Sequence, residues 1–124
     1  MRRIRIPVVL ALAAAGMAGS STPADARTPL VVEVDCSPGD LSFSCDAVAS
    51  GGATPYLYYY WTVTEYSYYD VENPSSSQVS YQYQVAGSSP TLSNSCTANR
   101  HVVVSVRVLD SVAGEDTGSS AFGC

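Results

Sequence analysis

Nine tyrosines are the most unusual chemical feature of this 124-residue chain, and all of them lie between Tyr56 and Tyr83. A tyrosine offers a large contact area at low entropic cost, together with a hydroxyl that donates or accepts a hydrogen bond. We predict a binding surface from five of them: Tyr56, Tyr58, Tyr60, Tyr66 and Tyr68. The expected partner is a protein or a cell-surface glycan. Ordinary packing between neighbouring strands is the alternative explanation for these residues.

Residues that commonly perform catalysis are sparse. His101 is the only histidine, and no Gly-x-Ser-x-Gly sequence offers a serine nucleophile for it to activate. A pair of carboxylates could form a glycosidase site, but the pairs Asp70–Glu72 and Glu115–Asp116 lie in predicted turns, where solvated acids are common. We therefore predict a protein that is not an enzyme, has no catalytic residues and needs no cofactor.

Carboxylates at strand ends can bind calcium in β-sandwiches. Two groups of oxygen-bearing side chains flank predicted turns, namely Asp110, Glu115 and Asp116, and Asp70, Glu72 and Asn73. Neither group matches an ordered calcium-binding loop. The Cys-x-x-Cys spacing that is typical of zinc sites is also absent from the sequence. We predict no metal site.

Residues 1–26 are typical of a secretory signal peptide. Arg2, Arg3 and Arg5 precede an apolar stretch over 6–18, and Ala24-Asp25-Ala26 fits a cleavage site. The apolar stretch is shorter than the roughly 20 residues that span a bilayer, although an N-terminal membrane anchor is the alternative. We predict a secreted domain over 27–124, extracellular or periplasmic, with no membrane insertion after signal cleavage.

The predicted mature chain is acidic. It contains three arginines and no lysine against ten acidic residues, which gives a net charge of −7. Such a chain repels the phosphates of nucleic acids and the headgroups of anionic lipids. We therefore expect no nucleic-acid partner.

The pattern of apolar residues predicts strands and no long helix. The period of two is clearest over 101–109, where four valines share one face: Val102, Val104, Val106 and Val108. Turns rich in Gly, Pro and Ser separate the predicted strands 30–35, 41–48, 56–64, 65–70, 78–85, 91–93, 101–109 and 117–124. About seven to eight short strands predict an all-β fold, a single immunoglobulin-like antiparallel β-sandwich.

The same alternation assigns side chains to faces of the strands. Residues expected to face the core over 41–48 are Leu41, Phe43, Cys45 and Ala47. Over 56–64 they are Leu57, Tyr59, Trp61 and Val63, which leaves Tyr56, Tyr58 and Tyr60 on the opposite face. Over 78–85, one face carries Val79, Tyr81, Tyr83 and Val85.

Two stretches carry short motifs. The first is 49–56, Ala-Ser-Gly-Gly-Ala-Thr-Pro-Tyr, followed by Tyr58 and Trp61; the second is 102–110, continuing to Gly114. Both resemble polycystic-kidney-disease-type and related bacterial immunoglobulin-like domains, over most of 30–124. The resemblance implies a spacer or binding module, with Asp110 capping the late hairpin and Gly114 in its turn.

This chain departs from the family pattern in two places. The segment from Pro55 to Trp61 is one residue longer, so we expect a β-bulge in the run of tyrosines. No Gly-Asp-Gly follows Trp61. The resemblance therefore supports the sandwich more than membership of one subfamily.

Four cysteines, Cys36, Cys45, Cys96 and Cys124, follow the predicted signal peptide. An even number in a small exported domain predicts two disulfides. The resemblance places the first two cysteines in the first hairpin and the last two around the final hairpin, which favours the pairs Cys36–Cys45 and Cys96–Cys124. A bond between the sheets, Cys45–Cys96, as in antibody domains, is the alternative.

The predicted class is a secreted, non-catalytic binding module whose tyrosine-rich sheet face recognises a protein or a glycan. A structural or self-assembling extracellular protein with no small ligand is the alternative, in which an exposed strand edge or the tyrosine face packs against another copy.

Overall fold

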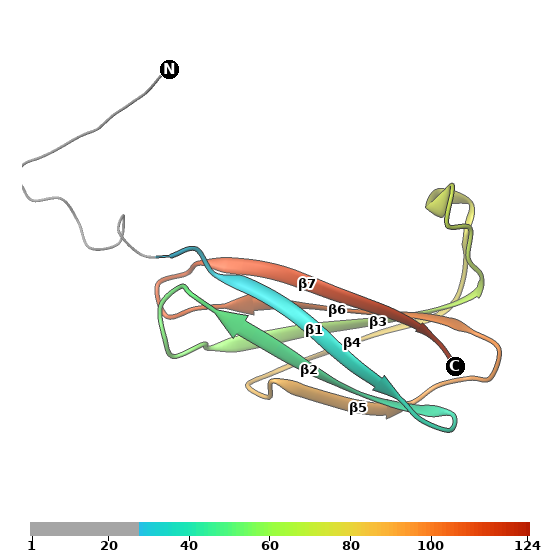
Figure 1. Ribbon diagram of the computed structural model, residues 1–124, viewed down its shortest axis with the longest axis horizontal. Coiled ribbons are helices and arrows are strands. Elements are labelled where there is room, and N and C mark those ends of the chain that lie inside the picture. Colours follow the sequence, from blue (N-terminus) through green and yellow to red (C-terminus); the bar gives the residue numbers. More distant parts are fainter. Residues whose placement is uncertain (1–27) are drawn as a thin grey trace, which may run out of the picture.

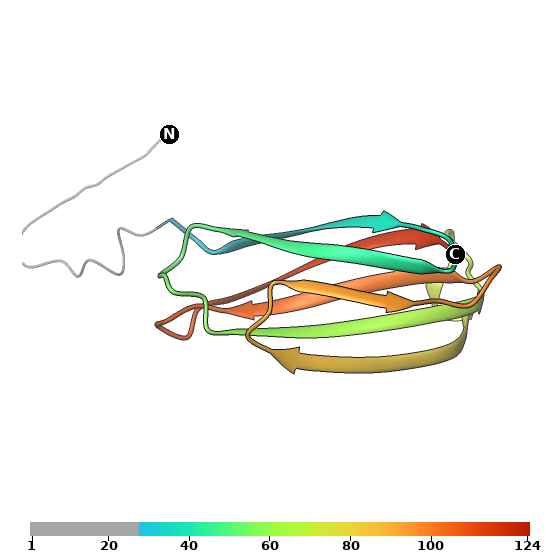
Figure 2. The ribbon, with the colours of Figure 1, turned by 90° about the horizontal axis from the view of Figure 1, so that it is seen from below.

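The computed structural model describes residues 28–124, so the predicted signal peptide over 1–26 lies outside the described residues. Figure 1 and Figure 2 show two packed layers of strands. One sheet has the order β1-β2-β5, and its strands are β1 (Val31–Pro38), β2 (Ser42–Ser50) and β5 (Thr91–Ser95). The other has the order β4-β3-β6-β7, with β3 (Tyr58–Tyr68), β4 (Gln78–Gly87), β6 (His101–Leu109) and β7 (Glu115–Gly123). All strand pairs are antiparallel, which confirms the predicted all-β immunoglobulin-like sandwich, with seven strands.

The core lies between the sheets, as the period of two predicts. The four valines on the predicted inner face of β6 are fully buried, and Trp61 and Val63 of β3 lie beside them. The opposite sheet contributes Phe43 and Cys45 of β2 to the same cluster. Full burial of a side chain such as valine contributes roughly 1.5–3 kcal/mol. This apolar layer therefore fixes which face of β3 and β6 turns toward solvent.

The central strand β3 differs from its prediction. The sequence suggested separate strands over 56–64 and 65–70, but one strand runs from Tyr58 to Tyr68. Pairing with β6 continues without a break as far as Tyr66, which lies directly opposite His101. The predicted bulge within the run of tyrosines was wrong, since the register shifts occur later, against β4, around Tyr66.

Three apolar residues also lie outside their predicted places. Leu41 precedes β2, has a φ of 55° and is half exposed, so it does not share the core face with Phe43. Leu57 precedes β3 and is likewise half exposed. Val79 lies opposite Tyr66 because of the register shift and is exposed.

The two predicted disulfides are confirmed. Cys36 lies directly opposite Cys45 in the β1–β2 hairpin and bonds to it. Cys96, which follows β5, bonds to Cys124 at the end of β7. Two disulfides fit an oxidising compartment outside the cytoplasm.

The two sides of the sandwich are closed differently. On one side β1 lies against β7, where the Val32 N–H donates to Asp116 Oδ2 at 2.9 Å. On the other side the opposing edge strands are unequal, because β5 has five residues and β4 has ten. Figure 1 shows that the β3–β4 connection, with its 3-10 turn Pro74–Ser76, stands away from both sheets. Within residues 28–124 no helix is long and apolar enough to span a membrane.

Candidate functional site

A pair of tyrosines lies on the outer face of the four-stranded sheet. Tyr59 and Trp61 point into the core, so Tyr58 and Tyr60 lie on the opposite side of β3. Their rings stack, with centroids 5.9 Å apart and planes inclined by 25°. Tyr58 is 51% exposed, and neither phenol hydroxyl forms a hydrogen bond within residues 28–124. The pair therefore presents both ring surface and open hydroxyls to solvent.

Arg107 on β6 lies beside this pair. It is directly opposite Tyr60 in the strand register, and its guanidinium carbon is 4.6 Å from the centre of the Tyr60 ring. This distance is within the range of cation–π contacts. The Arg107 Nη1 donates to Glu115 Oε1 at 2.7 Å, and this hydrogen bond raises the pKa of Arg107 above its ordinary value. Both side chains are about half exposed, so the ion pair orients the guanidinium more than it stabilises the fold.

Hydroxyl and amide side chains lie next to the contact between Tyr60 and Arg107. One row crosses all four strands in register and consists of Gln84, Thr62, Ser105 and Ser119. A depression of about 320 Å³ opens here, and its lining includes Tyr60, Thr62, Gln84, Ser105, Arg107 and Thr117. The depression thus combines an aromatic ring with several groups that donate or accept hydrogen bonds.

Tyr56 does not belong to this surface, so its predicted place there was wrong. It precedes β3 and packs against the core cluster, and its hydroxyl donates to the Gly51 carbonyl oxygen at 2.9 Å. The ring therefore fixes the loop before β3. The predicted alternation does not reach Tyr56 because the strand begins two residues later.

Tyr66 and Tyr68 lie at the far end of β3, six and eight residues after Tyr60, which is roughly 20 and 26 Å at the usual rise of a strand. The Tyr66 ring contacts Tyr69 in an edge-on arrangement, with centroids 5.0 Å apart, and Tyr69 stacks on His101 at 4.1 Å. Tyr68 is exposed at the end of the strand. The five predicted tyrosines therefore do not form one surface, and the candidate site contains Tyr58 and Tyr60.

The acidic residues of the late hairpin bind backbone groups. Asp110 is buried and accepts hydrogen bonds from the N–H groups of Ala53, Val112 and Gly114 at 3.0, 3.0 and 2.7 Å. It thus caps this hairpin, in the position that the family resemblance implies. Gly114 lies in the turn, where a Cβ atom would come within 2.6 Å of Asp110, while Ala113 takes the positive φ of 67°.

Asp70 organises the β3–β4 connection in a similar way. It accepts hydrogen bonds from the Ser76 hydroxyl and from the backbone N–H groups of Asn73 and Glu72. These hydrogen bonds, above all the one from Ser76, lower the pKa of Asp70 below its ordinary value of 3.8. Residues 28–124 contain no group of three or more His, Cys, Asp or Glu side chains that could hold a metal ion.

The residues that surround the tyrosine pair were not predicted from the sequence. Residues alternate between the two faces of β6, so Ser105 and Arg107 point away from the valine face. This signal was available in the sequence. Their position beside Tyr60 depends on the register between β3 and β6, which are separated by two other strands in the chain. Local periodicity carries no information about that register.

Comparisons of the chain with protein-family models, curated proteins and solved structures find no match. The fold and the site together define the class: an immunoglobulin-like sandwich with an aromatic and polar sheet face.

Proposed function

We propose that the protein is an exported, non-catalytic binding module, and that its outer sheet face binds a glycan chain. The observation that carries this proposal is the stacked pair Tyr58–Tyr60 beside the depression that Thr62 and Gln84 help to line. Sugar rings present C–H faces that pack on aromatic rings, and they carry hydroxyls that need donors and acceptors. An open sheet face can bind several sugar units of one chain.

The charge of the molecule favours a neutral glycan. Residues 27–124 carry a net charge of −7, and Arg107, the cation on this face, is already paired with Glu115. A polyanion would meet repulsion without a free positive charge to offset it. The resemblance to polycystic-kidney-disease-type domains belongs to the same proposal, because such domains usually serve as spacers or binding modules.

Self-assembly is a second candidate function, supported by strand β4. This edge strand is ten residues long, and Val79, Tyr81 and Val85 are exposed on it. Long edge strands with exposed apolar side chains pair readily with other chains. In this case another copy of the chain, and not a glycan, would be the partner.

A screen of neutral cell-wall and storage polysaccharides against the oxidised protein tests the glycan proposal. We expect saturable binding that weakens at least about tenfold in the double variant Tyr58→Ser/Tyr60→Ser, since both rings lose their contact area. Tyr68→Ser is the matched control, because Tyr68 is equally exposed but lies outside the pair. Equal binding by the double variant and the wild type would falsify the role of this face. A mass that rises with concentration in sedimentation, without polysaccharide binding, would favour self-assembly.

A further inference from the structure

Strand β4 extends past the sheet that lies opposite it, and this leaves a recess on its inner side. Tyr81 and Tyr83 of β4 lie opposite Glu65 and Val63 of β3, on the face that turns toward the other sheet. The short strand β5 covers this face only in part, so Tyr81 remains 58% exposed. A depression of about 310 Å³ lies here, lined by Glu65, Tyr81, Tyr83, Asn94, Ser95 and Thr97 among others. It is on the opposite side of the sheet from the Tyr58–Tyr60 pair.

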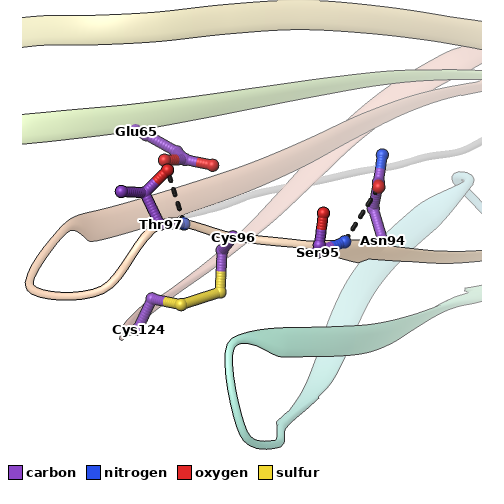
Figure 3. The surroundings of a disulfide bond; sticks show 6 residues. All are labelled: Glu65, Asn94, Ser95, Cys96, Thr97 and Cys124. Carbon is purple, nitrogen blue, oxygen red and sulfur yellow. Dashed lines mark hydrogen bonds between the residues drawn. A yellow bond between two sulfur atoms is a disulfide. The ribbon is translucent and has the colours of Figure 1, made fainter.

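Glu65 is a buried acid in this recess, with only 3% of its surface exposed. Its Oε1 accepts one long hydrogen bond, from the Thr97 N–H at 3.4 Å, next to the Cys96–Cys124 disulfide (Figure 3). Its Oε2 has no hydrogen bond and no ion pair within residues 28–124. The other buried acid, Asp110, accepts three backbone hydrogen bonds. Buried carboxylates are stabilised by hydrogen bonds or by a nearby positive charge, and Glu65 has little of either.

Within residues 28–124 no cationic side chain forms an ion pair with Glu65. The sequence contains no lysine, and Arg107 is held by Glu115 on the outer face. The Arg100 Nε donates to the Ser80 hydroxyl, and His101 stacks on Tyr69. A cation that pairs with Glu65 would therefore come from outside the described residues.

Two aromatic rings line the same recess as the buried acid. The Tyr81 and Tyr83 rings lie 5.5 Å apart, and Asn94 Nδ2 donates to the Tyr83 hydroxyl at 2.8 Å, which fixes that ring. Burial raises the pKa of Tyr83 above 10.0, and the Glu65 charge adds to this effect, so the phenol stays neutral. Neutral aromatic faces beside a carboxylate are the groups that recognise organic cations.

We infer that the recess formed by Glu65, Tyr81 and Tyr83 binds an organic cation, either an alkylammonium or a guanidinium group. The carboxylate of Glu65 neutralises the charge, the two rings cover the apolar part of the ligand, and Asn94 holds Tyr83 in place. A free amine or the side chain of a lysine or arginine from a partner protein would present this chemistry. The inference stands apart from the proposed glycan site, since the two share no residue.

Calorimetric titration of the oxidised protein with n-butylammonium and n-butylguanidinium tests the inference, with 1-butanol as the uncharged analogue. We expect saturable binding of at least one cation and none of the alcohol. Glu65→Gln removes the charge at constant size and should weaken cation binding about tenfold or more. The exposed acid Glu33 provides the matched control, Glu33→Gln, which should bind as the wild type does. Tyr58→Ser/Tyr60→Ser should also bind normally, which separates this site from the glycan site.

Several outcomes would overturn the inference. They are equal binding of the alcohol and the cations, no binding of either cation, or unchanged cation binding by Glu65→Gln. If circular dichroism shows that Glu65→Gln does not fold, Tyr81→Ala replaces it, because Tyr81 is largely exposed and its loss spares the core; unchanged binding there would also overturn the inference. A lysine peptide and its norleucine counterpart identify the source of the cation. Lysine-dependent binding tighter than that of n-butylammonium indicates a protein partner, and equal binding indicates a free amine.

Discussion

The carbonyl oxygen of Val32 lies 2.6 Å from the position that a Cβ atom would occupy at Gly118. These residues belong to β1 and β7, the two strands that close one side of the sandwich. The absence of a side chain at Gly118 allows the two backbones to approach. The hydrogen bond from the Val32 N–H to Asp116 Oδ2 holds the same contact.

Gly118→Ala should therefore destabilise the fold by about 1–3 kcal/mol, since the new methyl group would press on backbone that cannot move aside easily. Denaturant unfolding of the oxidised protein measures the change. Gly123→Ala is the control on the same strand, because no atom lies within 4 Å of the Cβ position there. Equal effects of the two substitutions would show that the close approach is not what matters.

Asp110→Ala should cost roughly 3 kcal/mol or more, because three backbone N–H groups lose a buried acceptor at once. The loops before β3 and after β6 should loosen together, since Ala53 and Gly114 share this carboxylate. Urea unfolding and amide exchange at both loops check this prediction. Asp46→Ala, at an exposed position of β2, provides the comparison and should change stability little.

Removal of the two disulfides should have unequal effects. The chain-entropy model gives about 2.5 kcal/mol for a bridge that closes a 9-residue separation and about 3.5 kcal/mol for one that closes 28. We expect Cys96→Ala/Cys124→Ala to lower the free energy of unfolding more than Cys36→Ala/Cys45→Ala does. The reverse order would indicate that burial of Cys45 in the core outweighs loop closure.

Acid should loosen the β3–β4 connection through Asp70. The folded-state pKa of Asp70 lies below 3.8, so its hydrogen bonds stabilise the connection above that pH and are lost as the pH falls through the folded pKa. Ser76→Ala removes the largest cause and should raise the pKa of Asp70 toward 3.8. NMR titration of the Asp70 carboxyl group measures both values. An unchanged midpoint in Ser76→Ala would contradict the role of the Ser76 hydroxyl.

Local patterns in the sequence were sufficient for the fold. Alternation alone identified the buried valine face of β6, and the turn signals separated most strands correctly. The prediction failed around Glu65, where the sequence suggested that one strand ended at Thr64 and another began. In the structure Glu65 is paired on both sides, with Tyr81 and Val102. Only these long-range pairings keep β3 continuous.

The candidate sites were harder to predict than the fold, for a similar reason. The stacked rings Tyr58 and Tyr60 follow from the period of two, but the guanidinium of Arg107 reaches them through the register of β3 against β6. The recess beside Tyr83 depends on the unequal lengths of β4 and β5, which face each other across the sandwich. Both features arise from contacts between segments that are distant in sequence.

The contact between β1 and β7 has a mechanical consequence. The two strands run in the same direction, so the start of β1 and the C-terminus lie at opposite ends of the long axis (Figure 1). Tension applied between these points acts along the strands and loads the β1–β7 contact in shear, where many interactions must break together. The two disulfides also exclude the loops that they close from the length that can be extended. Under oxidising conditions the domain should therefore unfold only at high force and extend over a short length. Reduction of the disulfides would add the chain between the paired cysteines to that length.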